Sequence, residues 1–577
     1  MYRINSITPK GGEAIELAGL TVLVGPNNCG KSQTLKDVRH YTTSGSQERL
    51  VVLKTIDVVI PTKDEFKARV NIRPNDNAVN QINVTGVKDD LMGQMSFGAG
   101  ASWFEDVFSS GVVQPQNRQQ ILQHLGPCLI AYLGAEARFK LTESSAAFNP
   151  RSESPSNALQ SLFAADSSVL AELRRVFQAA FEMDIGVDWA AMTKLYLRVA
   201  KNFGEIPDEK GALDALMAEA DELQKQGDGF RSFSGIALAL LTYPTRTFLL
   251  DEPEAFLHPT QARVLGRWLA GQASSRTAQI IVATHSADFL AGLVGASEDP
   301  TILRLNREGV ATRFHRIPKG VTIDLVESPL LSSQPVLDSL FHRGVVICEG
   351  DPDRAVYQTV AQHFVDNKRG EDFLFIHSNG KDAAKLPAKL LRESGTPVCV
   401  VADFDLLNSE QTLDEIVEGI TGIRLDEATK TLRADVAAAV ETKSQEQSLK
   451  ELKANVTKWQ EQSGCDLRRA KRSLVSFARA GSNKWEQAKK SGLACLPEGE
   501  RKLAVELISK LASLGVFIVP CGELESWMGL GLPKGNKWNQ QALQTLHNNE
   551  CPSALKEFVG DVLAFLTPLP QHGAPGG

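Results

Sequence analysis

The chain has 577 residues, a formal net charge of −7 and 42% apolar residues. This composition is typical of a globular protein and excludes collagen-like, fibrous and disordered chains. The acidic balance excludes coating of nucleic acid through global charge, so binding of that kind would need a local basic groove. The eight cysteines form no C-x-x-C pair. This argues against a disulfide framework and fits a reducing compartment.

The first residues show no basic stretch followed by an apolar one, so no secretory signal is predicted. Apolar runs stay shorter than about 18 residues, so no membrane span and no membrane partner are predicted. We therefore expect a cytoplasmic protein. A chain of this length favours two to four domains at roughly 100–200 residues each.

The first half of the chain has an α/β pattern. Residues 1–40 are predicted to form strand, turn, strand, glycine-rich loop and helix, with a buried strand at Leu20–Val24. Further strands are predicted within 50–75, and residues from about 150 to 226 have a helical pattern. Two buried strands and a β-rich stretch follow, at Thr247–Leu250, Gln279–Ala283 and Arg304–Pro318.

A second α/β series occupies the rest of the chain. Its buried strands are predicted at Gly344–Cys348, Phe373–His377, Val398–Ala402 and Gly515–Pro520. The stretch from about 408 to 510 is charged and mostly helical, and Leu449, Leu452, Val456 and Trp459 form one amphipathic stripe in it. A helix packed on its own domain explains this stripe better than a coiled coil. We expect two domains, at 1–335 and 336–570, and a flexible tail at 571–577.

A phosphate-binding loop is predicted directly after the first buried strand. Residues 25–32 match G-x-x-x-x-G-K-[ST] and open a helix. Small residues allow backbone N–H groups to surround a phosphate, and the helix N-terminus adds partial positive charge. Lys31 can reach the β- and γ-phosphates, and the Ser32 hydroxyl can bind Mg²⁺. The candidate ATP contacts in this segment are Asn28, Gly30, Lys31, Ser32 and Gln33.

The strand at Thr247–Leu250 delivers two carboxylates, Asp251 and Glu252. Asp251 would hold the Mg²⁺ that accompanies ATP, and Glu252 would orient and deprotonate the attacking water. Two acids after a strand can also cap the next helix. The phosphate-binding loop upstream favours the nucleotide interpretation.

Residues 251–259 resemble the Walker B motif and D-loop of ABC-type ATPases of the RecF/SMC kind. His285, in Ala-Thr-His-Ser after the next strand, resembles their switch histidine. Gly227–Ser232 lies where the ABC signature is expected but is not LSGGQ, and Ser232 is its candidate ATP contact. In that family the signature of one protomer closes over ATP on the other, so the resemblance implies a dimer or a higher homo-oligomer.

Acids also end two strands of the second half. Glu349 and Asp353 follow the first of them, and Asp403 and Asp405 follow the strand at 398–402. Carboxylates that meet at the C-terminal edge of a parallel sheet repel one another and therefore favour binding of divalent cations. Two cations about 4 Å apart could clamp the attacking and leaving oxygens of a phosphodiester.

These acids resemble those of a Toprim domain, and an ABC-type ATPase followed by Toprim is similar to the OLD (overcoming lysogenization defect) family of nucleases. That family includes Gabija-type and retron-associated anti-phage effectors. The resemblance implies that residues from about 150 to 226 serve dimerisation. It also implies metal ligands at Glu349, Asp353, Asp403, Asp405 and Glu525, or Glu523 in place of Glu525. A lysine that steadies the transition state is implied at Lys537 or Lys534, with Lys537 preferred.

The resemblance implies an ATP-regulated DNA endonuclease that uses two Mg²⁺ or Mn²⁺ ions, with a defence partner such as a helicase or a reverse transcriptase with its DNA. One alternative is a RecF/SMC-like ATPase without nuclease activity, acting through a partner. Another is a topoisomerase- or primase-type enzyme, although none of the six tyrosines stands out as a nucleophile. A nucleotide-switched interaction protein is the third. The basic residues Arg468–Arg472, Lys484, Lys489 and Lys490 could follow a DNA backbone, but a solvated helix face is the commoner explanation.

Overall fold

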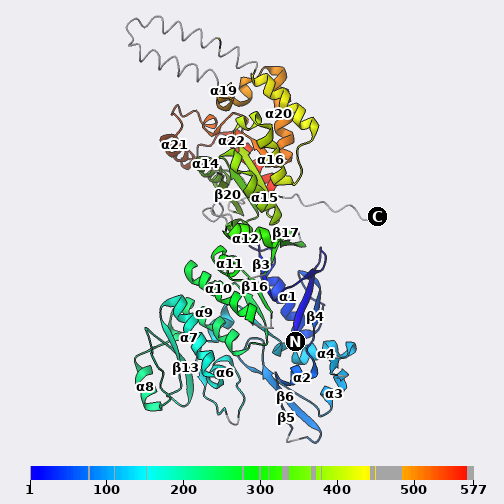
Figure 1. Ribbon diagram of the computed structural model, residues 1–577, viewed down its shortest axis with the longest axis vertical. Coiled ribbons are helices and arrows are strands. Elements are labelled where there is room, and N and C mark those ends of the chain that lie inside the picture. Colours follow the sequence, from blue (N-terminus) through cyan, green and yellow to red (C-terminus); the bar gives the residue numbers. More distant parts are fainter. Residues whose placement is uncertain are drawn as a thin grey trace. The chain divides into compact units, whose positions relative to one another are not determined.

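The computed structural model describes residues 2–75, 78–109, 111–150, 153–275, 279–297, 300–309, 311–327, 337–365, 372–378, 380–441, 449 and 484–567. The chain forms two compact units, Met1–Glu327 and Ser328–Gly577 (Figure 1). Several predicted features lie outside the described residues: the tail at 571–577, the basic run Arg468–Arg472, and Leu452, Val456 and Trp459 of the amphipathic stripe.

The first unit is built on a six-stranded sheet with the strand order β10-β15-β16-β3-β17-β18. The first five strands are parallel, and β18 is antiparallel to β17. Parallel strands covered on both faces are buried along their whole length, as β3 is. The strands are β3 (Leu20–Val24), β10 (Ile130–Leu133), β15 (Thr247–Asp251), β16 (Ile280–Ala283), β17 (Thr301–Glu308) and β18 (Ala311–Ile317).

Helices pack around this sheet (Figure 1). They are α1 (Lys31–Ser44), α4 (Arg118–Leu125), α5 (Ala135–Lys140), α9 (Asp228–Thr242), α10 (Pro259–Ser275), α11 (Ala287–Val294) and α12 (Lys319–Glu327). Smaller sheets and short helices complete the first 115 residues: β1 (Arg3–Pro9), β2 (Ile15–Glu16), β4 (Leu53–Val59), α2 (Lys63–Lys67), β5 (Asn71–Pro74), β6 (Gln81–Val87), β7 (Gln94–Gly100), α3 (Trp103–Val107), β8 (Phe108–Ser109) and β9 (Val112–Val113).

The prediction of a helical element from about 150 to 226 is wrong in part, because this segment is mixed. Its elements are α6 (Ala158–Ala164), α7 (Ser167–Phe181), β12 (Asp184–Asp188), β13 (Lys194–Ala200), α8 (Lys210–Ala218) and β14 (Asp221–Glu222). β13 pairs antiparallel with β12 and also with β11 (Ser145–Ala146) and β14. The residues of β13 explain the difference. Every second side chain of β13 is buried, and this alternation is the period of a strand and not of a helix.

The second unit has a four-stranded, fully parallel sheet with the order β20-β19-β21-β22. Its strands lie where the sequence predicts them: β19 (Gly344–Cys348), β20 (Phe373–His377), β21 (Val398–Ala402) and β22 (Val516–Ile518). Its helices are α14 (Asp351–His363), α15 (Lys385–Glu393), α16 (Glu410–Thr421), 427–441, α19 (Lys484–Ser491), α20 (Glu498–Ser513), α21 (Asn536–His547) and α22 (Ser553–Leu566). The α/β fold predicted for both halves is confirmed.

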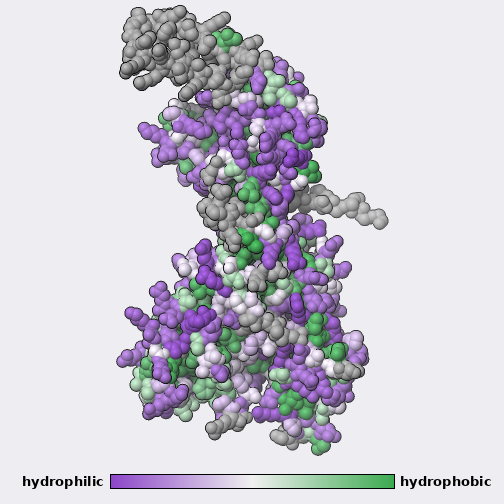
Figure 2. All heavy atoms as spheres, viewed as in Figure 1, coloured by the Kyte–Doolittle hydropathy of each residue, from purple (hydrophilic) through white to green (hydrophobic). Residues whose placement is uncertain are grey.

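Two features of the fold bear on function: the polarity of the surface and the position of the strand ends. On the face in view, hydrophilic residues dominate the surface of the second unit (Figure 2). Within the described residues, no helix combines the length and the apolar character needed to cross a bilayer. In a parallel sheet, the loops after the carboxyl ends of neighbouring strands gather at one edge, the usual place for a ligand site in α/β folds. In each unit these loops carry the motif residues.

Candidate nucleotide and metal sites

The loop between β3 and α1 has the backbone conformation that its glycines predict. Gly25, Asn28 and Gly30 have φ values of 141°, 60° and 105°. At Gly25 a Cβ atom would lie 2.3 Å from the carbonyl oxygen of Leu305, so only glycine fits. Lys31 is buried, and its Nζ donates to the carbonyl oxygens of Gly25 and Pro26 at 2.7 and 3.0 Å. The ammonium group is therefore held across the loop that would surround a phosphate.

Ser32 and Asp251 meet although they are far apart in the sequence. Ser32 Oγ donates to Asp251 Oδ1 at 2.7 Å, and the hydroxyl of Tyr132 donates to Asp251 Oδ2 at 3.0 Å. Burial raises the pKa of Tyr132, and the charge of Asp251 raises it further, so this hydroxyl stays a donor. A hydroxyl and a carboxylate brought together in this way are the pair that holds Mg²⁺ beside ATP in P-loop proteins. Gln33 instead donates to Asp37 of its own helix at 2.9 Å.

Glu252 and His285 lie side by side. His285 Nδ1 is 3.4 Å from Oε1 of Glu252 and 3.4 Å from Oε1 of Glu254. Glu254 is buried and accepts hydrogen bonds from the Thr284 hydroxyl at 2.8 Å and from the backbone N–H of His285 at 2.9 Å. Burial raises the pKa of Glu254. Glu254 thus fixes the histidine next to the acid that is predicted to activate water.

Arg138 supports the same acids and was not found from the sequence. Its side chain is fully buried in α5, and it donates to the backbone carbonyl oxygens of Asp251 and Glu252 at 2.7 and 3.1 Å. Burial lowers the pKa of Arg138. The arginine fixes the turn after β15, where Glu252 has a positive φ of 49°. An arginine in a short helix carries no sequence signal for this role.

Ser232 does not lie at the surface where an ATP contact was predicted. It is 0% exposed on the inner face of α9, and its hydroxyl has no hydrogen-bond partner among the described residues. The exposed residues at the start of this helix are Gly227 and Asp228. Because α9 begins at Asp228, Ser232 lies on the buried side of the helix, which does not favour the predicted contact.

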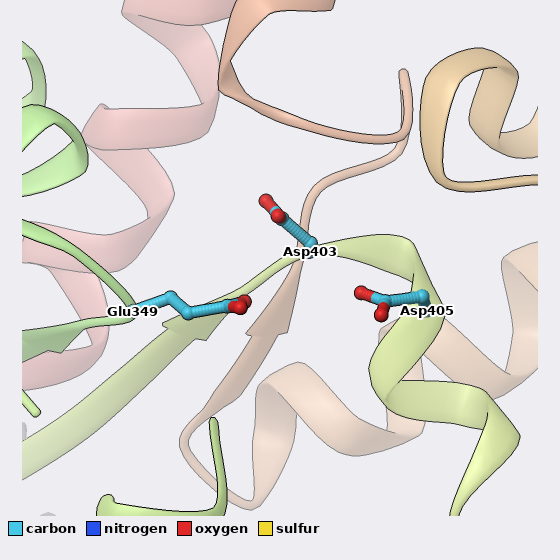
Figure 3. A group of neighbouring side chains, drawn as sticks. All are labelled: Glu349, Asp403 and Asp405. Carbon is cyan, nitrogen blue, oxygen red and sulfur yellow. The ribbon is translucent and has the colours of Figure 1, made fainter. Parts of the chain in front are cut away.

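Three carboxylates converge at the edge of the sheet in the second unit. Glu349 follows β19, and Asp403 and Asp405 follow β21. In Figure 3 the carboxylates of Glu349 and Asp405 face each other, and the carboxylate of Asp403 lies near them. One oxygen from each lies within 4.8 Å of the others. Burial raises the pKa of both Glu349 and Asp403. The charge of Asp403 raises the pKa of Glu349 further, whereas at Asp403 the nearby Lys489 opposes the effect of burial.

The residues of this cluster fit a divalent cation. Oε2 of Glu349 and Oδ1 of Asp405 are buried without a hydrogen-bond partner among the described residues. Buried carboxylate oxygens left without donors are costly unless a cation binds them. Carboxylates are the ligands that suit Mg²⁺ and Mn²⁺.

Two lysines lie against these acids. Lys489 Nζ is 2.8 Å from Asp403, 3.4 Å from Asp405 and 3.8 Å from Glu349, and Lys381 Nζ donates to Asp405 at 2.8 Å. Burial alone would lower the pKa of Lys489, but the three carboxylates raise it above its ordinary value. The preference for a solvated helix face is therefore wrong for Lys489, whereas Lys490 beside it is exposed and pairs with Glu486.

The remaining predicted residues lie around the cluster. Asp353 is in the first turn of α14, where burial, aided by Asp403 and Glu349, raises its pKa to about 7. Lys534 Nζ is 3.4 Å from Oε2 of Glu523 and 3.4 Å from Oε2 of Glu525, and its charge also acts on Asp403.

The preference for Lys537 over Lys534 is not supported by this geometry. Lys537 is exposed on α21 and has no ion pair within the described part of the chain. The physical reason is that α21 begins at Asn536, so Lys534 lies in the loop that returns to the acids. Both Glu523 and Glu525 contact Lys534.

Two family models match the chain. Residues 133–291 match the model described as "AAA domain, putative AbiEii toxin, Type IV TA system", a segment that includes Asp251, Glu252 and His285. Residues 340–405 match the model described as "Overcoming lysogenization defect protein-like, TOPRIM domain". This second segment contains the three converging carboxylates.

The solved structures that are similar to this chain include heads of SMC proteins. The SmcHead bound to the C-winged helix domain of ScpA is 12% identical, with a TM-score of 0.33, covering 54% of this chain and 97% of that one. The SMC head domain from Thermotoga maritima is 12% identical, with a TM-score of 0.30, covering 55% and 99%. The Smc head domain from Pyrococcus furiosus, bound to the C-terminal domain of ScpA, is 11% identical, with a TM-score of 0.33, covering 57% and 99%. No curated protein matches the chain.

Proposed function

Because the chain joins an AAA-type ATPase domain to an OLD-like Toprim domain, the composition of an OLD-family ATPase–Toprim nuclease, we propose that it is an ATP-regulated, divalent-metal-dependent DNA endonuclease. The observation that carries this proposal is the convergence of Glu349, Asp403 and Asp405 at the edge of the Toprim sheet, where Oε2 of Glu349 and Oδ1 of Asp405 are buried without a hydrogen-bond partner among the described residues. Converging carboxylates in a partly buried site are the ligands that a metal-dependent phosphodiesterase requires.

The acids and the lysine of the Toprim site would have different roles. Glu349, Asp403 and Asp405 would hold two Mg²⁺ or Mn²⁺ ions, with Asp353 and Glu525 or Glu523 completing the set. Bound divalent ions would supply an activated water and neutralise the charge on the leaving oxygen. Lys534 lies beside these acids, where its positive charge favours the approach of a phosphodiester.

The ATPase unit would regulate this chemistry. Lys31, Ser32 and Asp251 would bind ATP with one Mg²⁺, and Glu252, with His285 beside it, would orient the attacking water. DNA is the proposed substrate, a homodimer or larger homo-oligomer the proposed assembly, and anti-phage defence the proposed setting. A helicase or a reverse transcriptase with its DNA would be the kind of partner such a system supplies.

Cleavage of supercoiled plasmid tests this function. We expect Mg²⁺ or Mn²⁺ to support nicking, and Asp403→Asn to reduce it by about a hundredfold or more, because a ligand that carries negative charge is lost. Asp435→Asn, at an exposed acid of the same unit, serves as the matched control and retains full nicking. Lys31→Ala, assayed with and without ATP, reports whether nucleotide gates the cutting.

The opposite outcome has a defined meaning. Absence of cutting under every condition, with ATP hydrolysis intact, would overturn the nuclease proposal. It would favour a RecF/SMC-like ATPase that acts through a partner protein. Nicking that survives Asp403→Asn would place the chemistry outside the Toprim acids.

A further inference from the structure

Lys489 contacts all three converging carboxylates through one ammonium group. Its Nζ is 2.8 Å from Oδ2 of Asp403, 3.4 Å from Oδ1 of Asp405 and 3.8 Å from Oε1 of Glu349. A Mg²⁺ ion would bind such oxygens at about 2.0–2.1 Å. An ammonium group and a divalent ion repel each other and cannot share these oxygens, so only one of the two can occupy this space.

The position of Lys489 is set by tight backbone packing of α19. A Cβ atom on Gly492 would lie 2.1 Å from the carbonyl oxygen of Pro520, and one on Gly522 would lie 2.2 Å from that of Lys489. The N–H of Leu493 donates to the carbonyl oxygen of Pro520 at 2.9 Å. Because these backbones touch, α19 cannot slide along the loop that follows β22.

The loop that follows β22 is also hydrogen-bonded to the segment that carries the two aspartates. The N–H of Phe404, the residue between the two aspartates, donates to the carbonyl oxygen of Gly522 at 2.8 Å. On α19 itself, Trp485 and Ala488 are buried and anchor the helix. The loop after β22 thus joins α19 to the aspartates. The backbone position of Lys489 next to them is therefore set by the fold.

Lys381 differs from Lys489 in the oxygen that it uses. It donates to Oδ2 of Asp405 at 2.8 Å and to the backbone oxygen of Asp405 at 3.3 Å. Oδ1 of Asp405, which faces Lys489, is not engaged by Lys381. Lys381 can therefore hold Asp405 in place while a metal ion binds, whereas Lys489 has to leave.

We infer that Lys489 is a tethered cation that occupies the Toprim metal site in the metal-free protein and is displaced when a divalent ion binds. This role rests on the proposed function, because it requires that the three acids bind metal. Displacement needs only rotation of the four-carbon side chain, which is 23% exposed and has a route to solvent. The acids are thus neutralised at low metal concentration, and metal loading competes with an internal cation.

Binding of Mn²⁺ to the full-length, nucleotide-free protein tests this role. Free Mn²⁺ is measured by electron paramagnetic resonance during titration of the wild type and three variants. We expect Lys489→Met to bind about tenfold more tightly, the change that one charge-assisted hydrogen bond produces. Lys490→Met, at the adjacent exposed residue, binds as the wild type does. Asp403→Asn loses the binding and identifies the site.

Thermal unfolding gives a second measurement that is independent of activity. In chelator, Lys489→Met unfolds at a lower temperature than the wild type, because three neighbouring carboxylates lose their counter-ion. Added Mn²⁺ then raises its unfolding temperature by more than that of the wild type. Lys489→Gln, which keeps a hydrogen-bond donor for Asp403, takes the place of the methionine variant if that variant does not fold.

The two ways of failing are distinguishable. Equal or weaker Mn²⁺ binding by Lys489→Met, with binding still lost in Asp403→Asn, would overturn the role of Lys489 and leave the metal site standing. Absence of Mn²⁺ binding by the wild type, or binding that Asp403→Asn does not change, would overturn the metal site and the role of Lys489 together.

Discussion

Asp353 shows how a single carboxyl group couples the metal site to stability. Its pKa is raised to about 7 by burial and by the charges of Asp403 and Glu349. An ordinary Asp has a pKa of about 3.9, so the folded protein binds this proton more tightly than the unfolded chain does. Ionisation of Asp353 therefore costs stability, and the metal-free protein loses this contribution as the pH rises from about 4 to about 7.

Substitution of Asp353 by Asn removes this pH dependence. In chelator, we expect the free energy of unfolding of the wild type to fall, relative to that of Asp353→Asn, between pH 4 and pH 7. Urea denaturation at several pH values measures the difference. Asp351→Asn, at an exposed acid of the same helical turn, keeps the wild-type dependence. Parallel curves for wild type and Asp353→Asn would contradict the raised pKa.

Individual site residues were predictable only where local sequence carries a signal. Glu349, Asp403 and Asp405 could be found because each follows a buried apolar strand, and parallel strands end at one edge. Lys489 and Arg138 could not, because their roles depend on contacts with distant segments. Lys537 and Lys534 are three residues apart, and only the start of α21 separates their surroundings.

At the scale of elements, α10 and α11 touch through their backbones. A Cβ atom on Gly266 of α10 would lie 2.3 Å from the carbonyl oxygen of Phe289, and one on Gly292 of α11 would lie 2.2 Å from that of Arg263. α10 follows the Asp251–Glu252 turn, and α11 follows His285. The close approach of these helices therefore helps to fix the segments that carry the ATPase acids and the histidine.

A methyl group at this contact is expected to destabilise the first unit. Alanine normally favours a helix over glycine by about 1 kcal/mol. At Gly266 the clash with Phe289 outweighs this gain, and we expect a net loss of about 2 kcal/mol, as for other overpacked sites. Gly271→Ala, in the same helix with nothing within 4 Å, is expected to stabilise. Urea denaturation measures both, and stabilisation by both would contradict the close contact.

Strands and helices differ in how well the sequence predicts them. The strands β3, β15, β19 and β21 consist mostly of apolar residues, and short runs of this kind bounded by turn residues predict buried strands. β10 has only four residues, too few for a run to be told from a helical turn. The β12–β13 hairpin was missed because its neighbours α7 and α8 have strong helical patterns.

At the scale of the molecule, the two sites belong to separate compact units. The predicted ATP residues lie in Met1–Glu327 and the Toprim acids in Ser328–Gly577. Each unit has a buried core of its own. Domain order and fold class could be predicted because each half carries its own strand-end motif. The substrate, the partner and the assembly have no comparable local signature.

We expect two unfolding transitions in scanning calorimetry, and we expect each ligand to raise the temperature of one of them. ATP with Mg²⁺ raises the first unit's transition beyond the effect of Mg²⁺ alone, and Lys31→Ala abolishes this rise, because a ligand stabilises the unit that binds it. Mn²⁺ without nucleotide raises the second unit's transition, and Asp403→Asn abolishes that rise. A single transition, or equal shifts of both by either ligand, would show that the units unfold as one.

The strand order of the first unit also has a consequence for synthesis of the chain. β3 lies between β16 and β17, which are made from residues 280–308. At about 5–20 residues per second on the ribosome, β3 waits for its neighbours for some tens of seconds. The segment that carries Lys31 thus emerges well before the strands that enclose it, so a nascent chain gains its nucleotide site only after residues 280–308 have been made.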